Sequence, residues 1–210
     1  MPKVVDSDER RARLIAATSE AIARDGLANV TLRSIASSAG WTTGIVTHYF
    51  EDKRALLIAT FQSRADRARR QVDEAVARGR SPLDAILGTL PLDDDCLLDW
   101  RVFVAFAGAS IGDAEMGRLH RVRVDTFTRT VRGAIEHEQA AGVLAAHLDP
   151  GLEAARLVAL IHGIGVQAVI GAGGYTPADQ RAIVETHVTS LRAPQPRAST
   201  KPPSKKGPAT

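Results

Sequence analysis

The reactive side chains of this 210-residue sequence do not form a catalytic set that we can identify. We expect no nucleophile elbow of a serine hydrolase, no His-Glu-x-x-His metal site and no glycine-rich phosphate loop. The single cysteine, Cys96, has no nearby histidine and lies beside two leucines, which is typical of a small buried hydrophobic residue. The sequence therefore predicts that the protein is not an enzyme, and that it has no cofactor and no metal ligands.

The acidic run from Asp93 to Asp95 has a simpler interpretation than a metal site. Consecutive carboxylates on one helical turn point in different directions, whereas acidic residues favour the N-terminus of a helix.

Four isolated polar residues elsewhere in the chain could face a buried chamber, although a lone histidine on an apolar helix is usually just hydrogen-bonded. These candidates are His120, Asp125, His162 and Gln167.

Charge is unevenly distributed along the chain, although the formal net charge is only +3. Residues 1–80 carry +4, residues 81–193 carry −5, and residues 194–210 carry +4. The last segment is rich in proline and lysine and has little to bury, so it is predicted to be disordered. It is either a solvated tail of no specific use or an auxiliary contact to nucleic-acid phosphates.

Everything before this tail is predicted to be helical, so the fold class is all-α. Ser7 or Asp8 caps a first helix to Arg24, and short helices follow at 32–39 and from just after Thr42 to about Phe50. A long helix begins after Asp52 and ends near Gly79. Five more begin at Pro82, at the acidic cluster, after Asp113, at Pro150 and at Pro177, which gives about nine helices.

Two short helices around Gly40 have the composition of a helix-turn-helix. Ala36 is small enough for a close crossing, and Gly40 can adopt the left-handed conformation that a tight turn needs. The second helix then begins with Thr42-Thr43-Gly44, a polar and uncrowded first turn. Such an end is what a recognition helix inserts into the major groove of DNA.

At these residues the sequence resembles the TetR family of transcriptional regulators. The similarity comprises Thr31-x-Arg33-x-x-Ala36-x-x-Ala39-Gly40, then Thr42-x-Gly44, and then His48-Tyr49-Phe50-x-x-Lys53-x-x-Leu56-Leu57. It is strong over residues 8–60. It implies three units: a DNA-binding domain at 1–54, an effector-binding and dimerisation domain at 55–193, and the tail at 194–210.

The resemblance also implies residue roles at the DNA. Arg33 would reach a guanine edge, and Lys53 would neutralise a phosphate. The full implied set is Thr31, Arg33, Thr42, Thr43, Gly44, Thr47, His48, Tyr49 and Lys53. Two positions depart from the family pattern. Trp41 replaces a small aliphatic residue and either packs across the turn or touches the DNA backbone, and Thr47 stands where many members carry tyrosine.

Residues 157–174 carry no formal charge and contain five glycines. An apolar helix with many small residues fits close packing between helices better than a membrane span. The resemblance implies that the last two helices pair with their two-fold mates in a homodimer; core packing within one chain is the alternative. The implied interface residues are Leu160, Gly163, Ile164, Gln167, Ile183, His187 and Leu191.

The resemblance implies that the acidic middle of the chain, residues 81–149, binds a small-molecule effector. Trp100, Phe103 and Phe106 follow at three-residue steps, and the stretch 100–119 is similar to the BetI-like branch of the family, whose named member senses choline. With the four polar candidates above, these aromatic residues form the expected ligand set. Because the sequence has only nine aromatic residues, a cage around a quaternary ammonium is not favoured.

The sequence therefore predicts a cytoplasmic, homodimeric repressor. It would bind a palindromic double-stranded operator, release it when an effector binds, and make no membrane contact. A helical ligand-binding or interaction protein without DNA-binding activity is the alternative. The steep fall of DNA affinity with salt would distinguish the two.

Overall fold

The computed structural model describes the backbone of residues 3–193 and the side chains of residues 7–193. Nine helices and no strand lie within this part of the chain, where a single isolated bridge joins Leu144 to Arg192. The all-α prediction is confirmed. The predicted basic tail lies outside the described residues.

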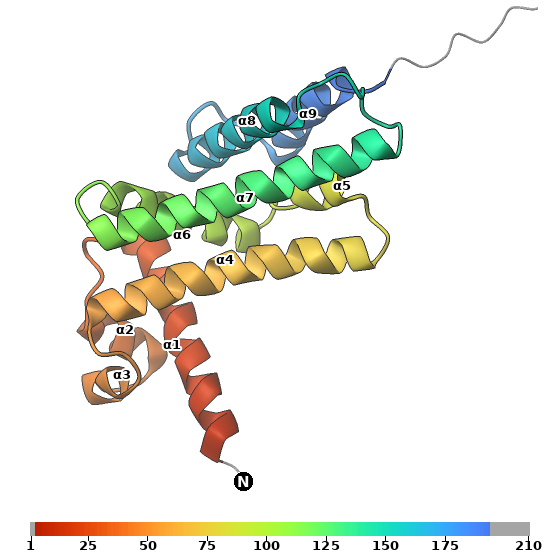
Figure 1. Cartoon of the computed structure of the whole chain (residues 1–210). Helices are drawn as coiled ribbons and strands as arrows, with labels where there is room; N and C mark the ends of the chain where they lie inside the picture. Colours follow the sequence, from red (N-terminus) through yellow and green to blue (C-terminus); the bar gives the residue numbers. More distant parts are fainter. Residues whose placement is uncertain (1–2, 194–210) are drawn as a thin grey trace, which may run out of the picture.

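Helices α1 (Lys3–Asp25), α2 (Leu32–Ala39) and α3 (Thr43–Tyr49) form a small N-terminal unit (Figure 1). The predicted bounds of α2 and α3 are confirmed to within a residue, and α2 has strong caps at both ends. Thr31 accepts a hydrogen bond from the Ser34 backbone N–H, while Gly40 ends α2 at a φ of 74°.

The start of α1 was predicted too late. The helix begins at Lys3 rather than after Ser7 or Asp8. Neither glycine nor proline occurs between Lys3 and Asp8, so nothing in this polar stretch stops the helix from extending past the first suitable capping residue.

The larger unit contains α4 (Lys53–Ala77), α5 (Pro82–Leu87), α6 (Asp94–Ala109), α7 (Ala114–Ala140), α8 (Pro150–Ile170) and α9 (Pro177–Ser190). Helix α4 runs without interruption from the small unit along the larger one, beside α7 (Figure 1). Helices α8 and α9 lie as a pair on the far side of α7 from α4. As predicted, each of α4 to α9 begins with a capping side chain: Asp52, Ser81, Asp93, Asp113, Asp149 and Thr176.

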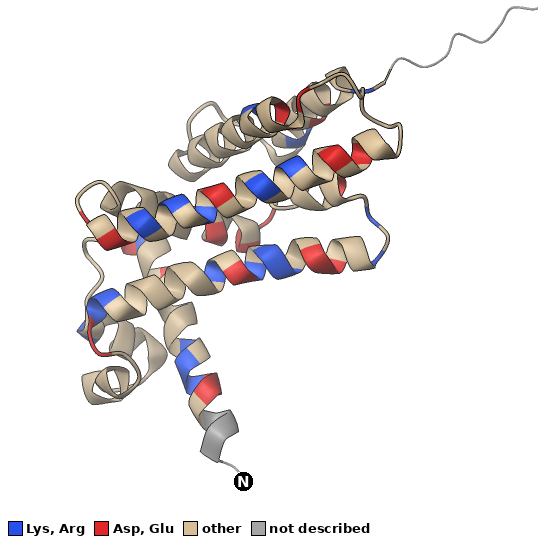
Figure 2. Ribbon diagram, viewed as in Figure 1, with Lys and Arg blue, Asp and Glu red and all other residues tan. Residues whose placement is uncertain are grey.

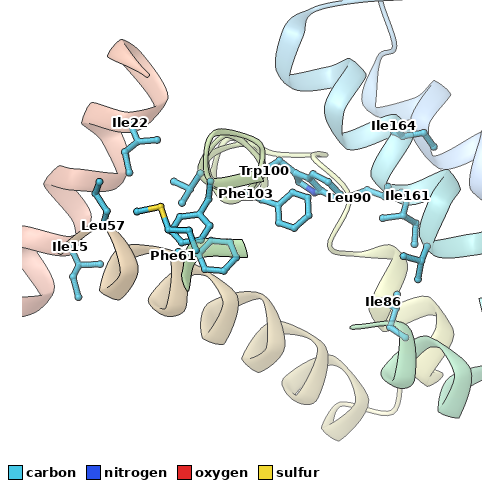
Figure 3. Packing of buried hydrophobic residues seen from close by; sticks show 14 of the residues in the cluster. Ile15, Ile22, Leu57, Phe61, Ile86, Leu90, Trp100, Phe103, Ile161 and Ile164 are labelled. Atoms are coloured by element: carbon cyan, nitrogen blue, oxygen red, sulfur yellow. The ribbon is translucent and has the colours of Figure 1, made fainter. Parts of the chain in front are cut away.

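One hydrophobic core joins the two units (Figure 3). Leu57 of α4 packs toward Ile15 and Ile22 of α1, whereas Phe61 begins the larger unit's core by stacking on Phe106 at 3.9 Å between ring centroids. Helix α4 therefore belongs to both units. A shift of α4 relative to α6 would also displace the N-terminal helices that pack on it.

Helix α8 is the one helix in the described part of the chain that is long and apolar enough to cross a membrane. Its inner face packs on α6, α7 and α9, with Leu157 and Ile161 fully buried. Packing inside the helical domain accounts for the apolar residues on this inner face.

The prediction of no serine-hydrolase elbow overlooked one segment that has the spacing of that motif. Residues 108–112 do have the spacing Gly-x-Ser-x-Gly, but they lie at the C-terminus of α6 instead of on a strand-to-helix turn. The Ser110 hydroxyl donates to the Phe106 carbonyl oxygen at 2.8 Å. This serine is thus part of a helix end and lacks the setting of a nucleophile.

Candidate DNA-binding surface and ligand chamber

The helix-turn-helix has a rigid apolar frame beneath a polar surface. Ile35 and Ala36 of α2 and Val46 of α3 are buried, and the Trp41 backbone N–H donates to the Ala36 carbonyl oxygen at 2.8 Å across the turn. This packing fixes the angle between α2 and α3. The first turn of α3 is left exposed, and the Thr42 side chain makes no capping hydrogen bond there.

Of the nine predicted DNA-contacting residues, eight lie on or directly before α2 and α3, and Lys53 is the first residue of α4. Seven are exposed, while Tyr49 and Lys53 are half-buried; the exposed ones are Thr31, Arg33, Thr42, Thr43, Gly44, Thr47 and His48. The Thr31 hydroxyl is already engaged in the α2 cap. Lys53 Nζ donates to the Ala28 carbonyl oxygen at 3.4 Å, a long bond that a phosphate can displace.

Trp41 packs across the turn, which was one of the two alternatives left open by the sequence. It is half-buried against the core, and the Arg13 guanidinium lies 4.8 Å from its ring centroid. Arg11 lies similarly over Phe50, at 5.1 Å. These cation–π contacts attach the middle of α1 to the helix-turn-helix.

A chamber of about 710 Å³ lies between α4 and α7, with α6 and α8 completing its wall. This volume suits an organic small molecule. The chamber's apolar wall includes Phe61, Trp100, Phe103, Leu119 and Phe127. Figure 3 shows Trp100 and Phe103 between the Phe61 side and the α8 residues Ile161 and Ile164.

The predicted ligand residues divide into three groups. Trp100, Phe103 and His162 line the chamber. Phe106 and His120 lie directly behind this wall, stacked on Phe61 and tilted against Phe103 respectively. The other two residues do not line this chamber. Asp125 is exposed, and Gln167 lines a smaller cavity between α8, α9 and the start of α6, because each lies on an outward-facing part of its helix.

The sequence did not reveal the charged network at the chamber wall. The Asp99 carboxylate accepts from Arg64 at 3.2 Å and from Arg67 at 2.7 Å. Burial raises the pKa of Asp99, while the two guanidiniums act in the opposite direction. We take Asp99 as ionised because each of its oxygens accepts from a cation. The sequence shows only the two arginines one turn apart.

Arg123 of α7 was also missed. Its guanidinium lies over the rings of Phe61 and Phe103, 5.4 Å from each centroid, and it lines the chamber. Burial lowers the pKa of Arg123, and Asp99 and Asp66 oppose this from a distance. Figure 2 shows that α7 carries a row of basic and acidic residues along its length, so the sequence pattern did not distinguish Arg123 from its exposed neighbours.

His162 is neutral at pH 7. Burial, followed by the charges of His120 and Arg123, lowers the pKa of His162 to about 4. Its ring lies among the aromatic residues of the chamber, 5.1 Å from the Phe103 centroid and 6.0 Å from that of Phe127.

This histidine is expected to make folding pH-dependent. Between pH 7 and pH 5 the unfolded imidazole, with a pKa of about 6.5, takes up a proton that the folded one does not. The free energy of unfolding therefore decreases as the pH is lowered from 7 to 5. The contribution is about 2 kcal/mol of unfolding free energy. Urea titrations at both pH values should show a smaller fall for His162→Phe. A variant of the exposed His147, His147→Gln, is the control, and an unchanged fall in His162→Phe would contradict the assignment.

An ion-pair cluster joins the two units where α4 begins. Arg54 forms two hydrogen bonds to the Asp113 carboxylate, at 3.0 and 2.5 Å, and also pairs with Glu115. Arg54 holds the pKa of Asp113 down at about 2. Asp113 also caps α7, so this residue connects the first turn of α4 to the helix that forms one side of the chamber.

The outer face of α8 is apolar and uncovered in the single chain. Side chains on this face, which we call the α8 stripe, repeat every three or four residues and are small or aliphatic: Leu152, Ala155, Ala159, Gly163, Val166 and Ile170. Of the predicted interface set, Gly163 and Gln167 are exposed, and Leu160, Ile183 and His187 are half-buried. Ile164 and Leu191 are only 4% and 5% exposed because they face the chain's own core, so the structure does not place them on this surface.

Comparison with known proteins gives two family matches. Residues 14–60 match the family described as bacterial regulatory proteins, tetR family, and residues 81–193 match the one described as BetI-type transcriptional repressor, C-terminal. A transcriptional regulator BetI from Stenotrophomonas maltophilia is 30% identical over 90% of this chain and 95% of its own length. The regulator PksA from Bacillus subtilis is 24% identical over 91% of this chain and 94% of its own.

Solved structures agree on the fold. A putative transcriptional regulator from Saccharomonospora viridis, solved in complex with choline, has a TM-score of 0.78 and 25% identity over 88% of this chain and 98% of its own. A putative TetR-family regulator from a Rhodococcus species has a TM-score of 0.76 and 21% identity over 89% of this chain and all of its own.

Proposed function

Because the chain belongs to the TetR family of bacterial regulatory proteins, we propose that it is a homodimeric repressor of a palindromic operator, released by a small molecule. Membership makes it a DNA-binding transcriptional regulator of the repressor type rather than an enzyme. The alternative of a helical protein without DNA-binding activity is thus not supported. The proposed location is the cytoplasm, where the operator would be.

The exposed first turn of α3 is the observation that most supports operator recognition. Thr42, Thr43 and Gly44 present hydroxyls and an uncrowded backbone on a helix whose other face is locked by Val46. Arg33 stands exposed near the start of α2, with a planar set of donors suited to a guanine edge or a phosphate. Both groups lie on one rigid unit, so they can engage the same groove.

Replacing Arg33 or Tyr49 with alanine is expected to raise the Kd for an operator duplex by about tenfold or more, which is the size of losing one good contact. The duplex would be obtained by selection from random DNA and tested by fluorescence anisotropy. Arg78→Ala is the matched control because it removes one charge from the far end of α4, where Arg78 pairs with Glu74 at 3.6 Å. Unchanged affinity in both test variants would refute this recognition surface.

The proposed dimer forms through the α8 stripe and the adjoining face of α9. An apolar surface with small residues permits close approach of a second helix, and this is the observation that supports the interface. Two-fold symmetry would present two α3 helices to one palindrome.

Gly163→Glu is expected to abolish dimerisation, because it would bury a charge in the proposed interface. Within the single chain a Cβ at Gly163 meets no atom within 4 Å, so the fold should tolerate the change. Gly133→Glu on α7 is the matched control, since that glycine also faces open space. Sedimentation at micromolar concentration should give a monomer for the first variant and a dimer for the second; a dimer in both would disprove this interface.

Release by a ligand would act through α4. This helix lines the chamber with Phe61 to Asp73 and begins at Lys53 beside the helix-turn-helix, where Arg54 links it to Asp113. A ligand that binds one position of α4 relative to α7 more tightly would change the spacing of the two α3 helices. Spin labels on these helices should report a changed distance when a DNA-releasing ligand binds.

A further inference from the structure

We propose that the chamber is selective for an anion, a carboxylate with an apolar body, and that Arg123 binds its charge. The inference rests on the proposed function, since it takes the chamber as the effector site. It names the ligand class and separates this chain from a relative that binds choline.

Arg123 is a cation with no carboxylate in direct contact, since Asp99 and Asp66 act on it only from a distance. Within the described residues it forms no ion pair and no hydrogen bond, and its guanidinium lies over the rings of Phe61 and Phe103. Ring faces attract a cation but leave its N–H donors unsatisfied. A guanidinium that lines a chamber in this state is suited to a carboxylate, which accepts two parallel hydrogen bonds from it.

The carboxylate that a cationic ligand would need is already occupied. Asp99 accepts from both Arg64 and Arg67, and Arg67 also pairs with the exposed Asp95 at 3.1 Å, so the Asp99 carboxylate is not available to a ligand. Asp66 and Asp73 are exposed at the mouth of the chamber, where Asp73 pairs with Arg69 at 3.7 Å. A quaternary ammonium inside would meet the charge of Arg123, and Asp66, the carboxylate of the lining that has no ion pair within the described residues, is exposed to solvent.

The remaining wall favours an apolar ligand body. Trp100, Phe103 and Phe127 supply aromatic surface, and Leu119 and Val124 supply aliphatic surface. Burial lowers the pKa of His120, as it does that of His162, so both imidazoles near Arg123 are neutral at pH 7 and neither competes for the anion as a charge. The ligand class is therefore a monocarboxylate whose hydrocarbon part fills the volume beyond Arg123.

The test is calorimetric titration of the full chain, without DNA, with straight-chain and phenyl-substituted monocarboxylates of four to ten carbons, their matched alcohols, and choline. At least one carboxylate should bind about tenfold or more tightly than its alcohol and than choline. Equal affinity for a carboxylate and its alcohol, tighter binding of choline, or no carboxylate binding would each overturn the proposal.

Variants assign the charge to Arg123. Arg123→Met should weaken carboxylate binding about tenfold or more and leave alcohol binding unchanged, and Arg123→Lys should retain part of the affinity. Arg118→Met, an exposed arginine on the same helix, is the control. Because Arg123 is an unpaired charge, Arg123→Met should have a Tm no lower than the wild type. Equal losses in Arg123→Met and Arg118→Met would refute the assignment. DNA affinity is not part of this readout, so failure of the operator proposal would be seen separately.

Discussion

Asp99→Asn is expected to destabilise the protein by about 3 kcal/mol. Asp99 is 8% exposed and holds Arg64 and Arg67, whose side chains are 14% and 30% exposed. The amide keeps the shape but removes the charge, so Arg64 would lose its counter-ion and Arg67 would keep only the exposed Asp95, at 3.1 Å. Urea denaturation followed by circular dichroism measures the loss.

An exposed ion pair provides the comparison. Asp73→Asn removes the partner of Arg69 in a pair whose side chains are 77% and 68% exposed, and it should cost less than about 1 kcal/mol. If the two variants lost equal stability, the Asp99 cluster would not stabilise the packing of α4 on α6 as we describe. The outcome also concerns the proposed release of DNA by a ligand, because this cluster attaches α4 to α6 beside the chamber.

The second large effect is expected from Gly165→Ala. A Cβ at Gly165 would lie 2.2 Å from two ring carbons of Trp100, a distance that no side chain tolerates. Trp100 cannot easily retreat, because its indole N–H donates to the Thr89 carbonyl oxygen at 2.8 Å and its ring packs against Phe103. Overpacking of this kind costs about 1–3 kcal/mol, and here the indole must also break or bend its hydrogen bond.

Fluorescence and thermal melting would report this change together. Gly165→Ala should lower the Tm and shift the Trp100 emission, since the ring is pushed toward the chamber. Gly133→Ala is the control, because a Cβ there meets nothing within 4 Å and alanine favours a helix over glycine. An equal or higher Tm for Gly165→Ala would show that α6 and α8 separate easily, contrary to the packing described.

Local signals in the sequence were sufficient for the helices and for the DNA-binding unit. Capping residues such as Thr31, Asp93 and Asp113 act within three residues of their own position, so helix starts can be predicted without knowledge of the fold. The helix-turn-helix is likewise a contiguous segment, and its exposed residues follow from its own turn at Gly40.

The chamber could not be predicted in the same way. Spacing showed that Trp100, Phe103 and Phe106 lie near one another on a helix, but only packing decided that Phe106 stacks on Phe61 behind the chamber while the other two line it. Gln167 and Ile164 were both assigned to the dimer interface, yet a difference of three positions places Ile164 in the core and leaves Gln167 exposed.

The sequence by itself determined that this protein is an all-α chain with an N-terminal helix-turn-helix of the TetR type, since those features depend on neighbours in the chain. Tertiary structure alone decided the electrostatics of the chamber. Asp99 meets Arg64 and Arg67 across 35 and 32 positions, and Arg123 meets Phe61 from another helix. Which charges are paired is therefore set by helix packing, and no local pattern records it.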